Sequence, residues 1–225
     1  MKSSLYVGLV HYPVYDKNFS VITTAITNYD LHDISRAAKT YGIKKYIIIH
    51  NIPGQLDMLR KIMQFWESPV GKAYNAYRTQ AFDIVDIPGQ LDMLRKIMQF
   101  WESPVGKAYN AYRTQAFDIV DIQDSIAAAI ESVTNREGLR PYVVTTDART
   151  YANTISYKEL RKRRETDCRP ILLLLGTGYG MTQEIMEAFD FILEPIRGYT
   201  TYNHLSVRSA AAIILDRLAG AAWWE

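Results

Sequence analysis

Residues 171–175 read Ile-Leu-Leu-Leu-Leu, and Gly176 follows directly. A continuous apolar run of this length that ends in glycine is typical of a parallel strand buried on both faces. Strands of this kind occur in sheets that helices cover on both sides. The run therefore predicts an α/β fold.

The rest of the chain alternates strand-like and helix-like segments. Strands are predicted at 5–10, 45–50, 141–145, 171–175 and 191–193, and helices at 31–41, 55–66, 125–133, 156–164 and through 210–215. Residues 14–18 read as a polar loop, and 21–26 as a short strand or an extended approach to the first helix. Asn28 or Asp30 is a suitable cap for that helix, and Ser125 and Ser156 are suitable caps for two later helices. Ser156 with Glu159 also forms a capping-box pattern. This alternation predicts a mostly parallel sheet flanked by helices.

Residues 52–86 and 87–121 are identical at every position. Natural repeat arrays drift in sequence and need about three units to bury a shared core. A single perfect doubling therefore indicates an engineered or very recent tandem duplication inside one domain that spans 1–225. Because a bare amphipathic helix would expose an apolar stripe, we expect the spare helix to pack against the body or against a second subunit.

Composition excludes several classes of protein. The single cysteine, Cys168, rules out an internal disulfide and suits a reducing cytoplasm. No apolar run reaches the length of a membrane span, and no signal peptide is recognised, so we expect a cytoplasmic protein without membrane contact. No His, Cys and carboxylate cluster has the spacing of a metal site. The formal net charge of +2 permits an RNA partner without requiring one.

Three stretches in the last third are suited to one ligand. Gly176, Gly178 and Gly180 alternate with larger residues after the buried run, which lets the backbone approach a ligand closely. A second apolar run, 191–193, ends at Glu194-Pro195, and a helix starts near 203–206. Ligands of open α/β sheets lie beyond the carboxyl ends of the strands. We therefore expect these three stretches to converge on one crevice.

These stretches resemble motifs of the SPOUT class of S-adenosylmethionine (SAM)-dependent RNA methyltransferases, the α/β-knot fold. Residues 28–42, from Asn28 through Arg36 to Gly42, are similar to the first motif, and 174–181 to the second. Residues 193–198 and 203–212 are similar to the third. With His11-Tyr-Pro13 near the start, the chain is most similar to the branch that occurs alone or fused behind a bacterial tRNA guanine-N1 methyltransferase.

The resemblance implies a C-terminal trefoil knot that holds SAM in a bent conformation. It also implies a homodimer whose active site is partly built by the second subunit, and an RNA substrate, in particular tRNA. The cofactor-binding residues that it implies are Thr145, Thr146, Leu175, Gly176, Gly178, Gly180, Leu193, Pro195, Ile196, Gly198 and Leu205. The chain departs from ribose-methylating relatives at Thr177 and Gly178, where those relatives carry an acidic residue, so the methyl acceptor stays open.

The catalytic candidates are Arg36, Glu194 and Ser206, and the substrate-binding candidates are Asn28, Arg78, Arg113 and Asn203. Each has an alternative role. Ser206 and Asn203 are equally good helix caps, and Glu194 is suited to binding backbone amides. Arg36 is by default a solvated helix charge. A proton acceptor is also available at His32, Asp33 or His204.

Two other functions compete with methyl transfer. The first is a catalytically silent module that binds the cofactor or RNA, or dimerises. The second is an engineered duplication that probes how a knotted domain folds. A dehydrogenase-type dinucleotide fold is excluded because the glycines run Gly-x-Gly-x-Gly near the C-terminal end, whereas that fingerprint is Gly-x-Gly-x-x-Gly after the first strand.

Overall fold

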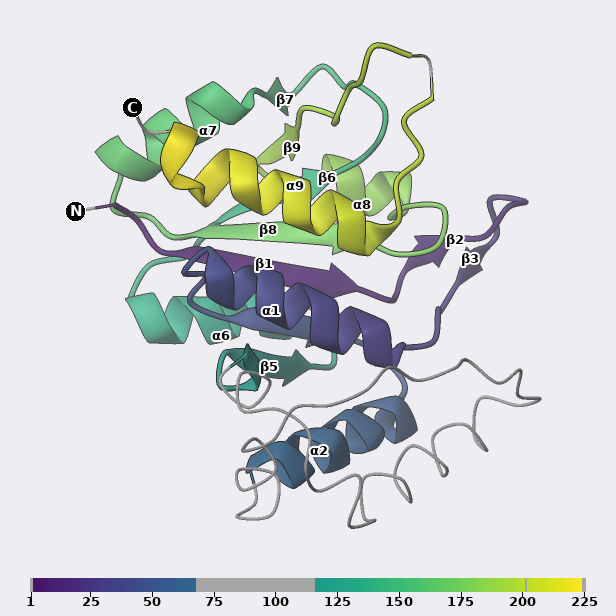
Figure 1. Ribbon diagram of the computed structural model, residues 1–225. Helices are drawn as coiled ribbons and strands as arrows, with labels where there is room; N and C mark the ends of the chain where they lie inside the picture. The colour runs from purple at the N-terminus through teal and green to yellow at the C-terminus, as the bar shows by residue number, and fades with distance from the viewer. Residues whose placement is uncertain (1, 68–115, 201, 224–225) are drawn as a thin grey trace, which may run out of the picture. The chain divides into compact units, whose positions relative to one another are not determined.

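The computed structural model describes residues 2–67, 116–200 and 202–223 (Figure 1). The chain forms two compact units, one comprising Met1–Leu56 with Ile119–Glu225 and the other Asp57–Asp118. Helix α2 (Pro53–Glu67) belongs partly to each unit. Residues 68–115, which include the helix of the second copy, lie outside the described residues, so the packing expected for the spare helix stays a prediction. The single domain over 1–225 stays a prediction.

The first unit contains a seven-stranded sheet in the order β5-β4-β1-β8-β6-β9-β7 (Figure 1). All neighbouring strands are parallel. The strands are β1 (Leu5–Val10), β4 (Tyr46–Ile49), β5 (Val120–Gln123), β6 (Tyr142–Thr146), β7 (Thr154–Ile155), β8 (Ile171–Gly176) and β9 (Phe191–Leu193). The expected α/β class with a mostly parallel sheet is therefore confirmed.

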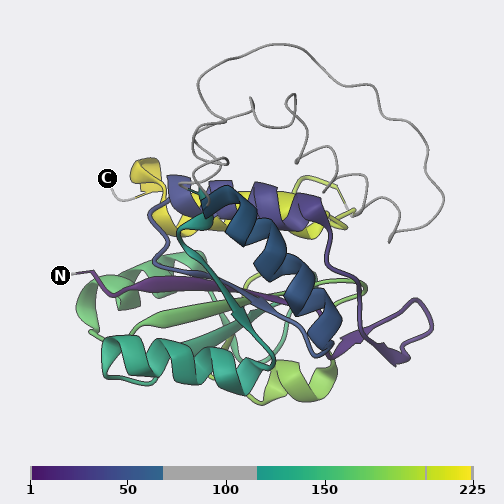
Figure 2. The ribbon, with the colours of Figure 1, turned by 90° about the horizontal axis from the view of Figure 1, so that it is seen from below.

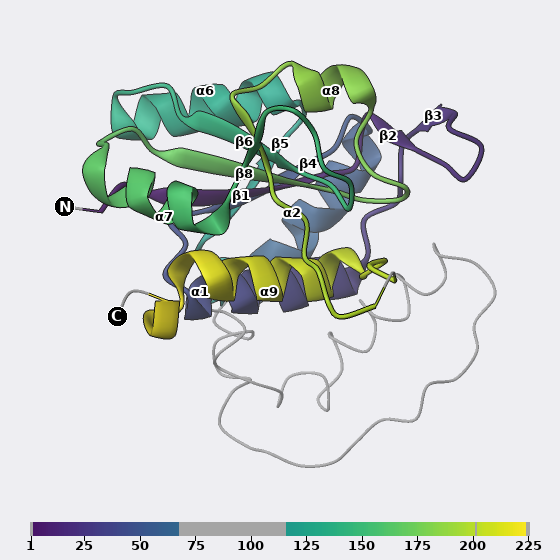
Figure 3. The ribbon, with the colours of Figure 1, turned by 90° about the horizontal axis from the view of Figure 1, so that it is seen from above.

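Helices cover both faces of this sheet. In Figures 2 and 3, α6 and α8 lie on one face, and α1 and α9 lie on the other. The helices of this unit are α1 (Ser35–Thr40), preceded by the π-helical turn η1 (Asp30–Ile34), α6 (Ile126–Glu137), α7 (Tyr157–Thr166), α8 (Gln183–Glu187), α9 (Val207–Ala219) and the 3-10 turn η3 (Ala221–Trp223). Coverage on both faces explains why β1 and β4 are buried at every residue and why Ile171–Leu175 is fully buried.

The order of the strands places β8 at the centre, between β1 and β6. Its residues pair with β1 from Leu5↔Ile171 to Val10↔Gly176 and with β6 from Tyr142↔Ile171 to Thr145↔Leu174. From β1, strands β4 and β5 lie on one side, and β8, β6, β9 and β7 lie on the other. The direction of the chain crossovers therefore changes between β1 and β8. Such a switch point is where α/β proteins bind ligands.

Two local expectations need correction, and one strand had no sequence signal. Val14 and Tyr15 form β2 (Val14–Tyr15), which pairs antiparallel with β3 (Val21–Ile22), so the expected polar loop starts only after Tyr15. The β7 strand was not expected, because two residues carry too little pattern. The first helix is capped by Thr27, whose hydroxyl accepts the Asp30 backbone N–H at 3.1 Å, and not by Asn28 or Asp30.

Two helix caps are confirmed. The Ser125 hydroxyl accepts the Ala128 N–H at the start of α6. Ser156 and Glu159 form the expected capping box at α7. The end of the second repeat, Val120 and Asp121, forms the first half of β5. The knot is tested by none of these observations and stays a prediction. Among the described residues, no helix is both long and apolar enough to cross a membrane.

Candidate functional site

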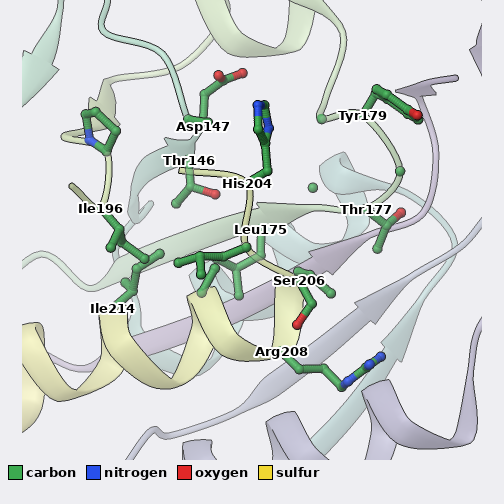
Figure 4. A pocket seen from close by; sticks show the side chains of 18 of the residues that line it. Thr146, Asp147, Leu175, Thr177, Tyr179, Ile196, His204, Ser206, Arg208 and Ile214 are labelled. Carbon is green, nitrogen blue, oxygen red and sulfur yellow. The ribbon is translucent and has the colours of Figure 1, made fainter. Parts of the chain in front are cut away.

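A cavity of about 950 Å³ lies at the carboxyl ends of β6, β8 and β9 and at the start of α9 (Figure 4). Its walls come from residues 146–149, 175–180, 193–196 and 203–208, with Ala210 and Ile214 from α9. Phe19, Tyr157 and residues of the segment 24–30 complete the lining. The three stretches expected to converge therefore do so, and the volume is within the range of small-molecule sites.

Most of the predicted cofactor-binding residues line this cavity: Thr146, Leu175, Gly176, Gly178, Gly180, Leu193, Pro195, Ile196 and Leu205. Thr145 and Gly198 are outside the lining. Thr145 is fully buried, and its hydroxyl donates to the Phe191 carbonyl at 3.4 Å. Because neighbouring residues of a strand point to opposite faces, Thr146 and Thr145 cannot both face the cavity.

The turn after β8 requires glycine at two positions. A Cβ atom on Gly176 would lie 2.9 Å from the backbone nitrogen of Met181. A Cβ atom on Gly178 would lie 2.8 Å from the carbonyl oxygen of Tyr15, and the φ of Gly178 is 60°. Both distances are too short for a real Cβ atom, so this turn packs backbone against backbone at the cavity wall.

Three predicted site residues line the cavity and also hold the surrounding loops. Glu194 accepts the backbone N–H of Tyr157, the first residue of α7, at 2.7 Å. Ser206 caps α9 by accepting the Ser209 N–H at 3.3 Å. The Asn203 amide donates to the Ala148 carbonyl at 2.8 Å. The contacts of Glu194 and Ser206 match the structural alternatives that the sequence left open, whereas Asn203 does not cap α9 and instead holds the loop at Ala148.

Two other predicted site residues, Arg36 and Asn28, are outside the lining of this cavity. Arg36 is exposed on α1, and Asn28 is half-buried before η1. Arg78 and Arg113 lie outside the described residues. None of the four can therefore be placed at the site from the described residues of one subunit.

The structure adds an ion pair that the sequence did not single out. Arg208 donates to Asp30 at 3.0 Å, and its guanidinium also lies 3.7 Å from the Asp33 carboxylate. The Asp30 side chain is only 7% exposed and also accepts the Thr27 hydroxyl at 2.6 Å. Arg208 lies within the third motif, at 203–212, and Asp30 is a suitable helix cap, so no local pattern indicates that the two side chains pair.

A second ion pair also lines the cavity. Arg149 contacts Asp147 with two nitrogens, at 3.0 and 2.9 Å, and the Tyr151 hydroxyl donates to the same carboxylate at 3.2 Å. The hydrogen bond to Asp147 raises the pKa of Arg149. This bidentate geometry fixes the 146–149 loop beside the cavity.

A buried polar network contacts the glycine turn, residues 176–180, at Thr177. His11 Nδ1 lies 3.0 Å from the Thr24 hydroxyl, which lies 2.5 Å from the Thr177 hydroxyl. The Ile52 N–H donates to His50 Nδ1 at 2.9 Å, so the other ring nitrogen of His50 carries the proton and donates to the Thr24 carbonyl at 3.1 Å. His50 is therefore neutral in this arrangement.

Stability is expected to fall as the pH decreases from about 6.5 to 4. Burial, followed by the electrostatic interaction with His50, lowers the pKa of His11 to about 4, and burial lowers the pKa of His50. The folded state thus favours neutral imidazole, and the unfolded chain takes up protons first. The shift of the His11 pKa alone lowers the free energy of unfolding by about 3 kcal/mol between these two pH values. Urea unfolding across this pH range measures it.

The matched variants are His11→Gln and, at an exposed site, His204→Gln. The first should flatten the dependence of the unfolding free energy on pH, and the second should leave it unchanged. Equal slopes for His11→Gln and the wild type would contradict the assignment.

The fold and this site define a class, an α/β protein with a cavity of small-molecule size at the switch point of a parallel sheet. Comparison with known proteins makes the class specific. The sequence profile of a family described as SAM-dependent RNA methyltransferases matches residues 4–93 and 84–220. The chain belongs to this family, so it is a methyltransferase that uses SAM and acts on RNA, as the resemblance implied.

Individual relatives agree. An uncharacterised protein of Aquifex aeolicus is 35% identical over 97% of this chain and 89% of its own length. A tRNA (guanine-N(1)-)-methyltransferase of Nitratidesulfovibrio vulgaris is 34% identical over 96% of this chain but only 42% of its own length. The chain thus spans less than half of that longer relative. These two matches fit the branch that occurs both alone and as part of a longer protein.

Solved structures show the same fold. A probable methyltransferase of Bordetella pertussis Tohama I superposes with a TM-score of 0.53, covering 96% of this chain and 95% of that one, at 13% identity. At this identity the match supports the fold alone.

Proposed function

We propose that the chain transfers a methyl group from SAM to tRNA, with SAM bound in the cavity at the carboxyl ends of β6, β8 and β9. The observation that carries the proposal is the convergence of the glycine turn, the 193–196 segment and the start of α9 on one cavity. The tRNA preference rests on the name of the longer relative. Because the chain covers less than half of that relative, guanine N1 is not assigned as the acceptor.

The lining residues suit this cofactor. Leu175, Leu193, Ile196 and Ile214 supply apolar surface for the adenine, and the glycine turn lets backbone groups approach it closely. The bound cofactor supplies an electrophilic methyl group on a sulfonium ion. The chain's own residues hold and orient it, and positioning of the acceptor in line with that methyl group supplies most of the rate.

The catalytic residues Arg36, Glu194 and Ser206 remain part of the proposal. Arg36 is exposed on α1 and outside the cavity of its own subunit, so its participation requires the homodimer that the resemblance implied. Light scattering after size exclusion tests that dimer. An RNA substrate and the single exposed cysteine, Cys168, are compatible with a cytoplasmic location.

Calorimetry with SAM, followed by transfer of a tritiated methyl group to unfractionated tRNA, tests the proposal. We expect saturable binding at one site per chain and label in the RNA. Binding without label would favour the catalytically silent module. The absence of SAM binding would reject the assignment of the cavity.

A further inference from the structure

Phe19 adopts a conformation that is unfavourable for its residue type. Its φ is 59°, and among the described residues it is the one non-glycine residue with positive φ. A bulky residue in this region is strained, and such strain persists only where the surrounding contacts enforce it. The Phe19 ring is also 66% exposed and lines the mouth of the cavity. Core packing therefore does not explain the strain.

The turn between β2 and β3 enforces this conformation. One carboxylate oxygen of Asp16 accepts the backbone N–H groups of Asn18 and Ser20, each at 2.8 Å. The Phe19 N–H donates to the Asp16 carbonyl at 3.1 Å, and the Asp16 N–H donates to the Ser20 carbonyl at 3.0 Å. Four hydrogen bonds thus hold the turn in a shape that directs Phe19 outward.

Tyr179 is presented in a similar way from a different part of the chain. It lies between Gly178 and Gly180, which both have positive φ, and it is 65% exposed at the cavity. Figure 4 shows its ring at the edge of the site, on the turn that also carries Thr177. Two flexible backbone positions are therefore used to place an aromatic ring in solvent.

The two rings share one support. The Tyr179 N–H donates to the Tyr15 carbonyl at 3.0 Å, and the Tyr15 N–H donates to the Gly180 carbonyl at 2.9 Å. The ring of Tyr15 contacts the ring of Phe19 edge-on, with centroids 5.7 Å apart. Hydrogen bonds between the hairpin and the glycine turn therefore set the positions of both rings before any ligand binds.

We propose that Phe19 and Tyr179 form a stacking platform for an unpaired nucleotide of the RNA substrate at the mouth of the methyl-donor cavity. This inference rests on the proposed function. A nucleotide must leave its stack to bring its acceptor atom into such a cavity, and aromatic rings replace the lost stacking without reading sequence. Arg149 in the same lining is 58% exposed. It donates Nε and Nη2 to Asp147, and the remaining edge of its guanidinium is available to donate to a neighbouring phosphate.

The test uses the full chain and a short fluorescein-labelled RNA of mixed sequence, as a single strand and annealed to its complement. The variants are Phe19→Asn, which suits positive φ but lacks the ring, and Tyr179→Ala. Fluorescence anisotropy without SAM should show single-strand affinity reduced by roughly 10-fold in each variant, with duplex affinity unchanged. Phe19→Trp and Tyr179→Phe keep an aromatic ring and should bind the single strand as the wild type does.

Val21→Ala is the matched control, because Val21 is 53% exposed on the same hairpin but outside the cavity lining. It should bind the single strand as the wild type does. Phe19→Asn should also be at least as stable as the wild type, since asparagine tolerates this backbone region. Weaker binding of the single strand without a loss of stability in Phe19→Asn would show that the Phe19 ring binds RNA and does not stabilise the fold.

The platform is refuted if the wild type does not prefer the single strand, or if both variants keep wild-type affinity for it. It is also refuted if both RNA forms lose affinity equally. Because RNA binding is measured without SAM, these outcomes are independent of calorimetry with the cofactor. A chain that binds single strands through both rings but fails to bind SAM would instead refute only the proposed function.

Discussion

Replacing Gly178 with alanine is expected to weaken SAM binding by at least about 10-fold, which corresponds to roughly 1.4 kcal/mol. The added Cβ atom would lie 2.8 Å from the Tyr15 carbonyl oxygen, and the φ of 60° is itself unfavourable for alanine. The turn must shift away from β2 to relieve the contact. Because the same turn forms a cavity wall, the shift alters the cofactor site. Calorimetry with SAM measures the change.

Gly138→Ala is the matched control for Gly178→Ala. Gly138 ends α6 with a φ of 73°, so alanine suffers a similar backbone strain there. A Cβ atom at this position would meet nothing within 4 Å, and Gly138 is not in the cavity lining. Both variants should lose some stability, but only Gly178→Ala should lose SAM affinity. Equal affinity in the two variants would contradict the assignment of the glycine turn to the cofactor site.

Replacing Arg208 with alanine is expected to lower the free energy of unfolding by about 2 kcal/mol. Asp30 is 7% exposed, and it would keep its Thr27 hydrogen bond but lose its ionic partner at 3.0 Å. Leaving a buried carboxylate without its cation costs more than the pair itself contributes. The effect is below that of a fully buried pair because Arg208 is partly exposed. Urea unfolding at neutral pH provides the measurement.

A double-mutant cycle separates the pair from other effects. Asp30→Asn combined with Arg208→Ala should be less destabilised than the sum of the two single variants, since the unpaired charge is then absent. Arg60→Ala is the control, because Arg60 pairs with Asp57 on an exposed helix surface and should change stability little. Additive single effects would show that Asp30 and Arg208 do not stabilise each other.

Much of the fold could be predicted from local pattern. Ile171–Leu175 is apolar at every position because β8 is buried on both faces, and that pattern is visible in the sequence. The serine caps could also be predicted from local pattern, since Ser125 and Ser156 accept N–H groups within the next turn. The short strands β2 and β7 were missed because two residues carry no detectable period.

The site was predictable where a segment's position in the sheet determined it. The glycine turn, Pro195 and Leu205 follow or precede buried elements whose ends meet, so their convergence could be inferred. Pairings across the fold could not. Arg208 and Asp30 are far apart in the chain, and no local signal shows that their side chains meet. The strain at Phe19 was also hidden, because phenylalanine does not normally signal positive φ.

A crystal structure of the chain with bound SAM tests the central claim most directly. The account predicts the adenosine in the cavity between the glycine turn after Leu175, the bend at Pro195 and the first turn of α9. Density for SAM at any other place, with this cavity closed by protein side chains, would contradict it.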